Sequence, residues 1–505
     1  MKTRLAWVLF GVFLIYVAIA ALRPVSSPGG FNLAEFGRLP VLVNGRVQPI
    51  DSAARMGLLQ VRGTVTVPPE DNKPAWQFWA RGHTLDATEW LLELLVKPDA
   101  ADARNVFPVD STLRDTLGLE ARAGSSGYYA FKELEPRLDA IGKQVRRIAT
   151  VKAADRAAWE RDCLRLRNAL VIYERLKNSL QPNSFLRHGA AGNALPYDFD
   201  GLLRQYTADL RVGVEAAVDR QHGKDHPLDE ATEERMRAFA RPFIGVSRAG
   251  MLAVIPPADP TRTRDRWQNI GTALVDSART GLLPGAAAHF AAMSSAFARN
   301  RPLVFNIELA NYRRWLGARG MAPEVSRARS EYFSNRFQPL VRATAIYLVA
   351  FVLICASWFR RSTALYRSAA ALVLLAYVLH TTGLLFDVML EGRLPIANLY
   401  AAIIFGGWGV VLLAGGVERF LRNGIGLATA ALTGVTTLAL AHSLVPAGGP
   451  ALLKAVLDVN FCLAIAVMSI ACGLARHAKP RGVRSGAELQ VDPAGKGSRW
   501  RLGQL

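Results

Sequence analysis

Six long apolar stretches decide what this chain can fold into. A helix needs roughly 20 apolar residues to cross a hydrocarbon core of about 30 Å. The first stretch covers residues 5–22, and five more follow at about 341–358, 368–389, 398–416, 424–442 and 455–475. The overall hydrophobic share of 51% averages a polar middle with an apolar last third. The sequence therefore predicts an all-α membrane protein.

The first apolar stretch has two interpretations, an uncleaved anchor and a cleaved signal peptide. Lys2 and Arg4 precede it, and Ala18-Ile19-Ala20 has the small-residue spacing that signal peptidase accepts. A signal peptide usually has a shorter apolar core, of about 7–15 residues. We therefore favour an uncleaved anchor over residues 1–22, and a cleaved signal peptide is the alternative.

Basic residues at the ends of the apolar stretches predict the orientation of the chain. The first and second C-terminal stretches are separated by Arg360, Arg361 and Arg367, and the third and fourth by Arg419 and Arg422. The last stretch is followed by Arg476, His477, Lys479, Arg481 and Arg484. By the positive-inside rule these segments and the N-terminus are cytoplasmic. We expect an extracytoplasmic domain at residues 23–340, a five-helix transmembrane bundle at 341–476 and a disordered basic cytoplasmic tail at 477–505. This organisation is typical of a multi-pass protein of the bacterial inner membrane.

In a soluble protein, a net charge of +20 would suggest a nucleic-acid partner, but in this chain the charge is weaker evidence for one. No nucleic-acid recognition motif accompanies the basic residues, and anionic lipid headgroups account for part of the excess. The sequence predicts a lipid bilayer and no nucleic acid among the partners.

Cysteine usage excludes two classes of protein. The chain has Cys163, Cys355, Cys462 and Cys472, of which the last three lie inside apolar stretches, and it contains no C-x-x-C. A disulfide framework is therefore excluded, and the absence of C-x-x-C argues against a thiol–disulfide exchanger. Without C-x-x-C-H the chain is not itself a c-type cytochrome.

The polar middle is predicted to be mostly helical with one small β-hairpin. Asn44-Gly45, between apolar flanks, is a strong hairpin signal, and a helix should begin near Asp51 with Asp51 or Ser52 as its cap. Helical spacing of apolar residues covers 87–96, 128–148, 154–180 and 198–217. No nucleotide-binding, hydrolase or zinc-protease motif occurs, so the domain is typical of a scaffold. We interpret Trp76, Phe78, Trp79 and Trp90 as core residues and the pair His222 and His226 as part of a solvated loop.

Two histidines are the main candidates for function in the bundle. An ionisable residue within a membrane helix is costly and is a functional candidate by default. His380 lies in the outer half of its stretch and His442 closes another stretch at its outer end. Neutral imidazole is a good ligand for haem iron. The alternatives are that His380 bonds Thr381, Thr382 or a carbonyl of a neighbouring helix, and that His442 is an interfacial residue in water.

The loop that follows His380 suits a flat, apolar and anionic ligand. Arg393 offers a cation at the outer surface, Asn398 is placed as a helix cap, and Tyr400 and Trp408 offer aromatic rings. Haem, with its propionates, has these properties. The sequence therefore predicts a haem site, with His380 as the metal ligand, made by His380, His442, Arg393, Asn398, Tyr400 and Trp408.

The same stretch resembles the CcsA/ResC family of cytochrome c biogenesis proteins, the haem-handling component of system II. The matching positions are His380, Gly383, Gly392, Arg393, Pro395, Asn398, Tyr400 and Trp408. Residues 456–461 are similar to the start of the family's next haem-side helix, and residues 36–51 resemble an external domain of some bacterial members. The resemblance implies a synthase-type complex that presents haem to the C-x-x-C-H thiols of apocytochrome c, with a ResB-like membrane partner.

The chain departs from the family pattern in four ways. Ala401 and Ala466 stand where members have an acidic residue and a histidine, and the Trp-rich segment and a later histidine are absent. We therefore assign no catalytic residue, and we expect a truncated member or a reading frame broken near residue 478. The alternative function is a non-enzymatic membrane scaffold whose external domain binds envelope proteins.

Overall fold

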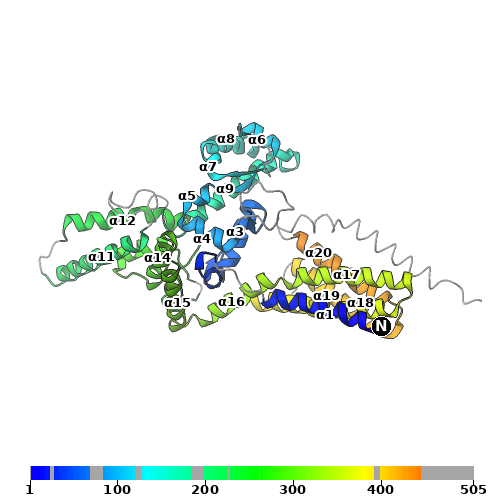
Figure 1. Ribbon diagram of the computed structural model, residues 1–505. Coiled ribbons are helices and arrows are strands. Elements are labelled where there is room, and N and C mark those ends of the chain that lie inside the picture. The colour runs from blue at the N-terminus through cyan, green and yellow to red at the C-terminus, as the bar shows by residue number, and fades with distance from the viewer. Residues whose placement is uncertain are drawn as a thin grey trace, which may run out of the picture.

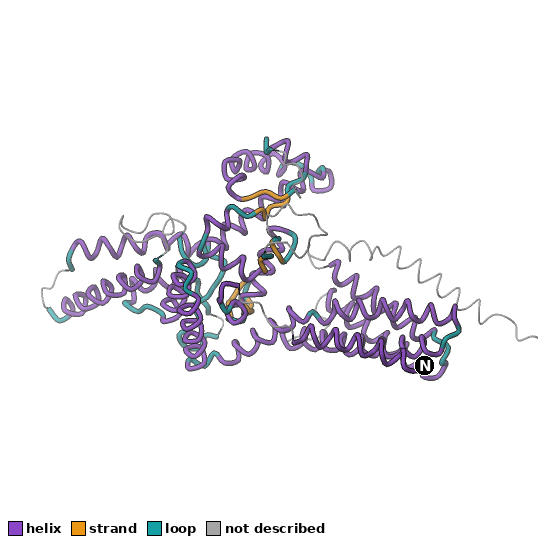
Figure 2. Tube along the Cα trace, viewed as in Figure 1, coloured by secondary structure: helices purple, strands orange, loops and turns teal. Residues whose placement is uncertain are grey.

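The computed structural model describes residues 2–22, 28–68, 83–120, 127–182, 198–223, 228–260, 262–264, 266–391 and 399–444. These residues form an elongated molecule, with a large domain at one end of a bundle of long helices (Figure 1). Helices dominate both parts, and the short strands all lie in the large domain (Figure 2).

The bundle contains four helices that are long and apolar enough to cross a membrane, within the part of the chain that the structure describes. They are α17 (Pro339–Arg360), α18 (Thr363–Glu391), α19 (Leu399–Leu421) and α20 (Ile425–Leu444). They match four of the five predicted stretches, and the fifth, at 455–475, lies outside the described residues. The predicted tail at 477–505 also lies outside them.

The N-terminal helix α1 (Lys2–Leu22) packs against α18. Its apolar part, Trp7–Leu22, is shorter than the four long helices. The N-terminus lies at the end of the bundle away from the large domain (Figure 1). The domain is joined to the bundle through α16 (Ala322–Phe337), which meets α17 at Gln338, where the backbone adopts a left-handed conformation (φ 44°).

A buried glutamate closes the bundle at the turn between α19 and α20. The carboxylate of Glu418 accepts hydrogen bonds from the backbone N–H groups of Gly424, at 2.7 Å, and Gly426, at 2.9 Å. It also accepts one from the hydroxyl of Tyr366, at 2.7 Å. The first N–H groups of a helix have no partner within the helix, and a carboxylate there also interacts favourably with the helix dipole. Glu418 therefore has a structural role in starting α20.

We expect Glu418→Ala to lower the free energy of unfolding by about 2 kcal/mol, because it leaves buried N–H groups without a partner. Tyr366→Phe removes only one of the three hydrogen bonds and should cost about 1 kcal/mol. Thermal unfolding of the purified protein in detergent measures both changes. Equal stability of Glu418→Ala and the unmodified protein would contradict the role of Glu418.

In the residues that the structure describes, the large domain is built from short and medium helices with three two-stranded antiparallel sheets. Its helices are α2 (Leu33–Gly37), α3 (Ile50–Arg62), α4 (Ala87–Val96), α5 (Pro98–Asp102), α6 (Ser111–Leu117), α7 (Phe131–Leu134), α8 (Leu138–Ala149), α9 (Ala158–Lys177), α11 (Phe199–Gln221), α12 (Glu230–Ala249), α13 (Ile270–Thr280), α14 (Gly285–Ala298), α15 (Pro302–Ala318) and α16. Its strands are β1 (Pro40–Val43), β2 (Arg46–Pro49), β3 (Thr66–Val67), β4 (Leu85–Asp86), β5 (Asn105–Pro108) and β6 (Tyr128–Ala130).

The predicted hairpin is confirmed, but it is not the only β element. Strands β1 and β2 pair in the register Val43 with Arg46, around a turn in which Asn44 (φ 51°) and Gly45 (φ 77°) are both left-handed. The sheets β3–β4 and β5–β6 were not predicted from the sequence. The range 128–148 is not one helix, because its first three residues pair with β5. Strands this short leave too few alternating residues for a periodic signal.

The predicted cap of α3 is wrong. The helix begins at Ile50 after Pro49, and no side chain caps it. The carboxylate of Asp51 instead accepts hydrogen bonds from side chains on α3, α4 and α16. A residue type that commonly caps helices is used here for tertiary contacts.

The core of the domain contains a buried ion pair among aromatic rings. The ammonium of Lys177 lies 2.7 Å from Asp102 and 4.7 Å from the ring centre of Phe131, and the hydroxyl of Tyr173 donates to Asp102 at 2.9 Å. Burial, together with the nearby Asp102, raises the pKa of Tyr173 well above its ordinary value. Trp90 is fully buried, as predicted, whereas Trp76, Phe78 and Trp79 lie outside the described residues.

Candidate functional site

His380 is buried in the middle of the bundle. It lies on α18 closer to Glu391 than to Thr363, and its side chain has no exposed surface. Its Nε2 lies 3.2 Å from the carbonyl oxygen of Ile404 on α19. Because a carbonyl can only accept, Nε2 carries the proton, and Nδ1 is left with a lone pair. Nδ1 is buried and has no partner among the described residues.

The structure shows which of the three expected hydrogen-bond partners His380 uses. The hydroxyls of Thr381 and Thr382 bond carbonyls of their own helix, those of Tyr377 and Val378, each at 2.8 Å. His380 is therefore held by a carbonyl of a neighbouring helix. This bond occupies one ring nitrogen and fixes the orientation of the other, as the second hydrogen bond of a metal-binding histidine does.

Tyr347 lies beside His380 and was not predicted. Its ring, on α17, meets the imidazole edge to face with 6.2 Å between the ring centres. It is fully buried, and its hydroxyl has no partner among the described residues. On its other side is Gly434 of α20, where a Cβ atom would lie 2.6 Å from Cδ2 of Tyr347. A tyrosine in an apolar stretch was the signal that could have identified this position.

His442 lines a small cavity near the end of α20. The cavity has a volume of about 30 Å³ and is lined by Leu340, Val341, Thr344, Tyr400, Ile404, Leu438, Ala441 and His442. Nε2 of His442 is buried without a partner among the described residues. Ile404 lies near both histidines. It lines this cavity together with His442, and its carbonyl oxygen accepts a hydrogen bond from His380. The structure thus brings His380, His442 and Tyr400 to one region of the bundle.

Trp408 has a packing role instead of an open ring face. Its Nε1 donates to the hydroxyl of Thr381 at 2.9 Å. Its ring stacks on Tyr377 and Phe405, with ring centres 5.7 and 5.9 Å apart. It joins α18 to α19 on the turn next to His380. Arg393 and Asn398, the other two predicted haem contacts, lie outside the described residues.

The donor atoms of this region fit haem iron better than its free space does. Nδ1 of His380 and Nε2 of His442, which have no partner among the described residues, are suitable ligands for the metal. A cavity of about 30 Å³ has room for a water molecule and not for a porphyrin. A bound haem would therefore need the ends of the helices near the large domain to move apart. Within the described residues no group of three or more His, Cys, Asp or Glu side chains could hold a metal ion.

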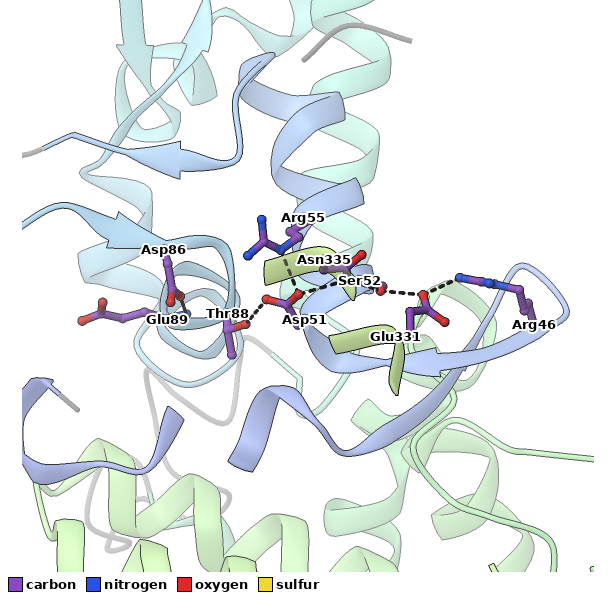
Figure 3. A network of polar contacts seen from close by, with 9 residues as sticks. All are labelled: Arg46, Asp51, Ser52, Arg55, Asp86, Thr88, Glu89, Glu331 and Asn335. Carbon is purple, nitrogen blue, oxygen red and sulfur yellow. Dashed lines mark hydrogen bonds and ion pairs between the residues drawn. The ribbon is translucent and has the colours of Figure 1, made fainter. Parts of the chain in front are cut away.

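A second polar cluster joins the domain to α16 (Figure 3). Asp51 accepts from Arg55 at 2.8 Å, from Thr88 at 3.1 Å and from Asn335 at 3.2 Å. Beside it, Glu331 accepts from Ser52 at 2.6 Å and from Arg46 at 2.5 Å. These side chains come from β2, α3, α4 and α16 and bond one another, so the cluster fixes the domain to the helix that leads into the bundle. We call these residues the junction cluster: Arg46, Asp51, Ser52, Arg55, Thr88, Glu331 and Asn335.

Neither the known protein families nor the curated proteins provide a match to this sequence.

Proposed function

We propose that the protein handles haem for cytochrome c maturation, and that haem binds in the half of the bundle nearest the large domain. The observation that supports this is a pair of buried imidazole nitrogens, Nδ1 of His380 and Nε2 of His442, without partners among the described residues. An unpaired buried polar atom is costly, so a ligand that satisfies both atoms would be favoured. His380 would hold the haem through its neutral imidazole, and the haem would supply an iron that accepts this ligand.

The residues around His380 support its role as the metal ligand. Its Nε2–H donates to Ile404, which orients the ring and directs the lone pair of Nδ1 to the opposite side. Tyr347 packs against the ring and limits its rotation. His442 and Tyr400 lie toward the end of the bundle, where the propionates of a haem could reach water. Arg393, by its place in the sequence, would pair with a propionate.

The direction of the helices supports an orientation with the domain outside the cytoplasm. The N-terminus of α1 lies away from the domain, and α17 starts near the domain and ends at Arg360, at the opposite end (Figure 1). Arg419 and Arg422, at the end of α19, belong to that same end. Under the positive-inside rule, His442 and the domain then face the outside of the bacterial inner membrane.

This orientation agrees with the resemblance to the CcsA/ResC family. Haem held near His380 and His442 would be available to the C-x-x-C-H thiols of an apocytochrome c on the outer side, with a ResB-like protein as the membrane partner. We assign no catalytic residue for the attachment step.

A second candidate function is a membrane scaffold that binds no haem. The hydrogen bond from His380 to Ile404 favours it, because the same bond is a satisfactory structural role for a buried histidine. The two functions differ in whether the purified protein carries haem.

The visible spectrum of the protein purified from haem-replete cells distinguishes the two functions. We expect a Soret band, and we expect His380→Ala to reduce the haem that copurifies by tenfold or more. His222→Ala, at an exposed histidine at the end of α11, is the matched control and should keep the band. A colourless preparation of the unmodified protein would support the scaffold.

A further inference from the structure

A groove of about 550 Å³ runs along the two-helix arm formed by α11 and α12. This arm projects from the domain on the side away from the bundle (Figure 1). The last turn of α13 also lines the groove, through Ala278, Arg279 and Thr280. None of the residues that line the groove belongs to the bundle, so it is separate from the histidines there.

The floor of the groove is apolar. From α11 it receives Leu210, Gly213, Val214 and Ala217, which stand at positions i, i+3, i+4 and i+7 and so share one helix face. From α12 it receives Met236 and Ala240, which are four residues apart and so also share one face. Val214 and Val218 stay 39% and 44% exposed. Apolar surface of this kind in a hollow is typical of a binding site.

The rim of the groove is basic. Arg220, Arg237 and Arg279 line it, against a single carboxylate, that of Glu233. Glu233 already pairs with Arg237 at 2.5 Å. Two guanidinium groups, those of Arg220 and Arg279, thus remain to attract a negatively charged occupant. The charge of the rim favours an acidic ligand and disfavours a basic one.

We propose that this groove binds an amphipathic, acidic helix of a partner protein on the same side of the membrane. The lining residues of α11 extend from Leu210 to Gln221, which is about 16 Å at 1.5 Å per residue, or roughly three helical turns. An apolar floor with a charged rim is the arrangement with which grooves bind amphipathic helices. The apolar face of the partner would cover Val214 and Ala217, and its acidic flank would meet Arg220 and Arg279. This proposal does not depend on haem binding.

Two synthetic peptides test the proposal on the full-length protein in phosphatidylcholine nanodiscs. Both are 16-residue fluorescent helices with leucine on one face, and the remaining positions are glutamate in one peptide and lysine in the other. Fluorescence anisotropy, corrected with empty nanodiscs, gives each Kd. We expect the glutamate peptide to bind at least tenfold more tightly than the lysine peptide, and the double variant Arg220→Glu, Arg279→Glu to reverse this preference.

A bulky substitution locates the binding to the groove. Ala217→Trp fills the floor and should weaken binding of the glutamate peptide tenfold or more, while Ala288→Trp, at an exposed position of α14, should leave it unchanged. Equal binding of the two peptides, or equal binding to Ala217→Trp and the unmodified protein, would overturn the proposal. So would native mass spectrometry that shows one anionic lipid per protein which Ala217→Trp removes, because the groove would then be a lipid site.

Discussion

Gly434→Leu is expected to lower the free energy of unfolding by about 3 kcal/mol, because its side chain would enter the space of the Tyr347 ring. Even a Cβ atom at this position would lie 2.6 Å from Cδ2 of Tyr347, and the ring is confined on its other side by His380. To relieve this steric clash, α17 and α20 must separate or Tyr347 must change its rotamer. Thermal unfolding in detergent measures the loss.

Gly415→Leu is the matched control, because nothing lies within 4 Å of a Cβ atom built on Gly415 of α19. Both variants add the same side chain to a long apolar helix of the bundle, so they differ only in what that side chain contacts. If the two variants unfold at the same temperature, the packing of Tyr347 between Gly434 and His380 is not as described.

Asp51→Leu should cost about 3 kcal/mol, because removing one partner from a buried charged network leaves the others without compensation. Asp51 is nearly fully buried and accepts from Arg55, Thr88 and Asn335. The loss should be greatest where the domain meets α16, and hydrogen exchange of the backbone of α16 should become faster. Differential scanning fluorimetry and hydrogen-exchange mass spectrometry measure the two effects.

Asp115→Leu provides the comparison for a surface pair. Asp115 also bonds an arginine, Arg114, at 2.8 Å, but its side chain is 68% exposed. An exposed ion pair contributes at most about 1 kcal/mol. A loss from Asp51→Leu no larger than that from Asp115→Leu, with unchanged exchange in α16, would show that the junction cluster does not fix the domain to the bundle.

Most of the fold that was predicted correctly lies where apolar residues form a long stretch or recur at helical spacing. The four apolar stretches became α17 to α20, and the helix over 87–96 has the bounds of α4. Asn44-Gly45 identified the hairpin because few residues other than Asn and Gly adopt two successive left-handed conformations. The sheets β3–β4 and β5–β6 were missed because their strands have only two to four residues.

The candidate site could be predicted only in part, because its contacts join different helices. His380 and His442 were predicted because each is an ionisable residue in or at the end of an apolar stretch, and the structure brings both near Ile404. Nothing in the sequence indicates that Tyr347 packs between Gly434 and His380, since that contact depends on how α17, α18 and α20 pack. Trp408 was predicted as a ligand-facing ring, but its bond to Thr381 makes it a contact between helices.

Titration of the purified, haem-free protein with haem tests the central claim most directly. The unmodified protein and His222→Ala should each bind one haem and give the same Soret maximum. His380→Ala should bind at least tenfold more weakly, and added imidazole should restore the Soret maximum by replacing the missing ligand. A His380→Ala protein that binds haem with unchanged affinity and an unchanged spectrum would contradict the assignment of His380 as the haem ligand.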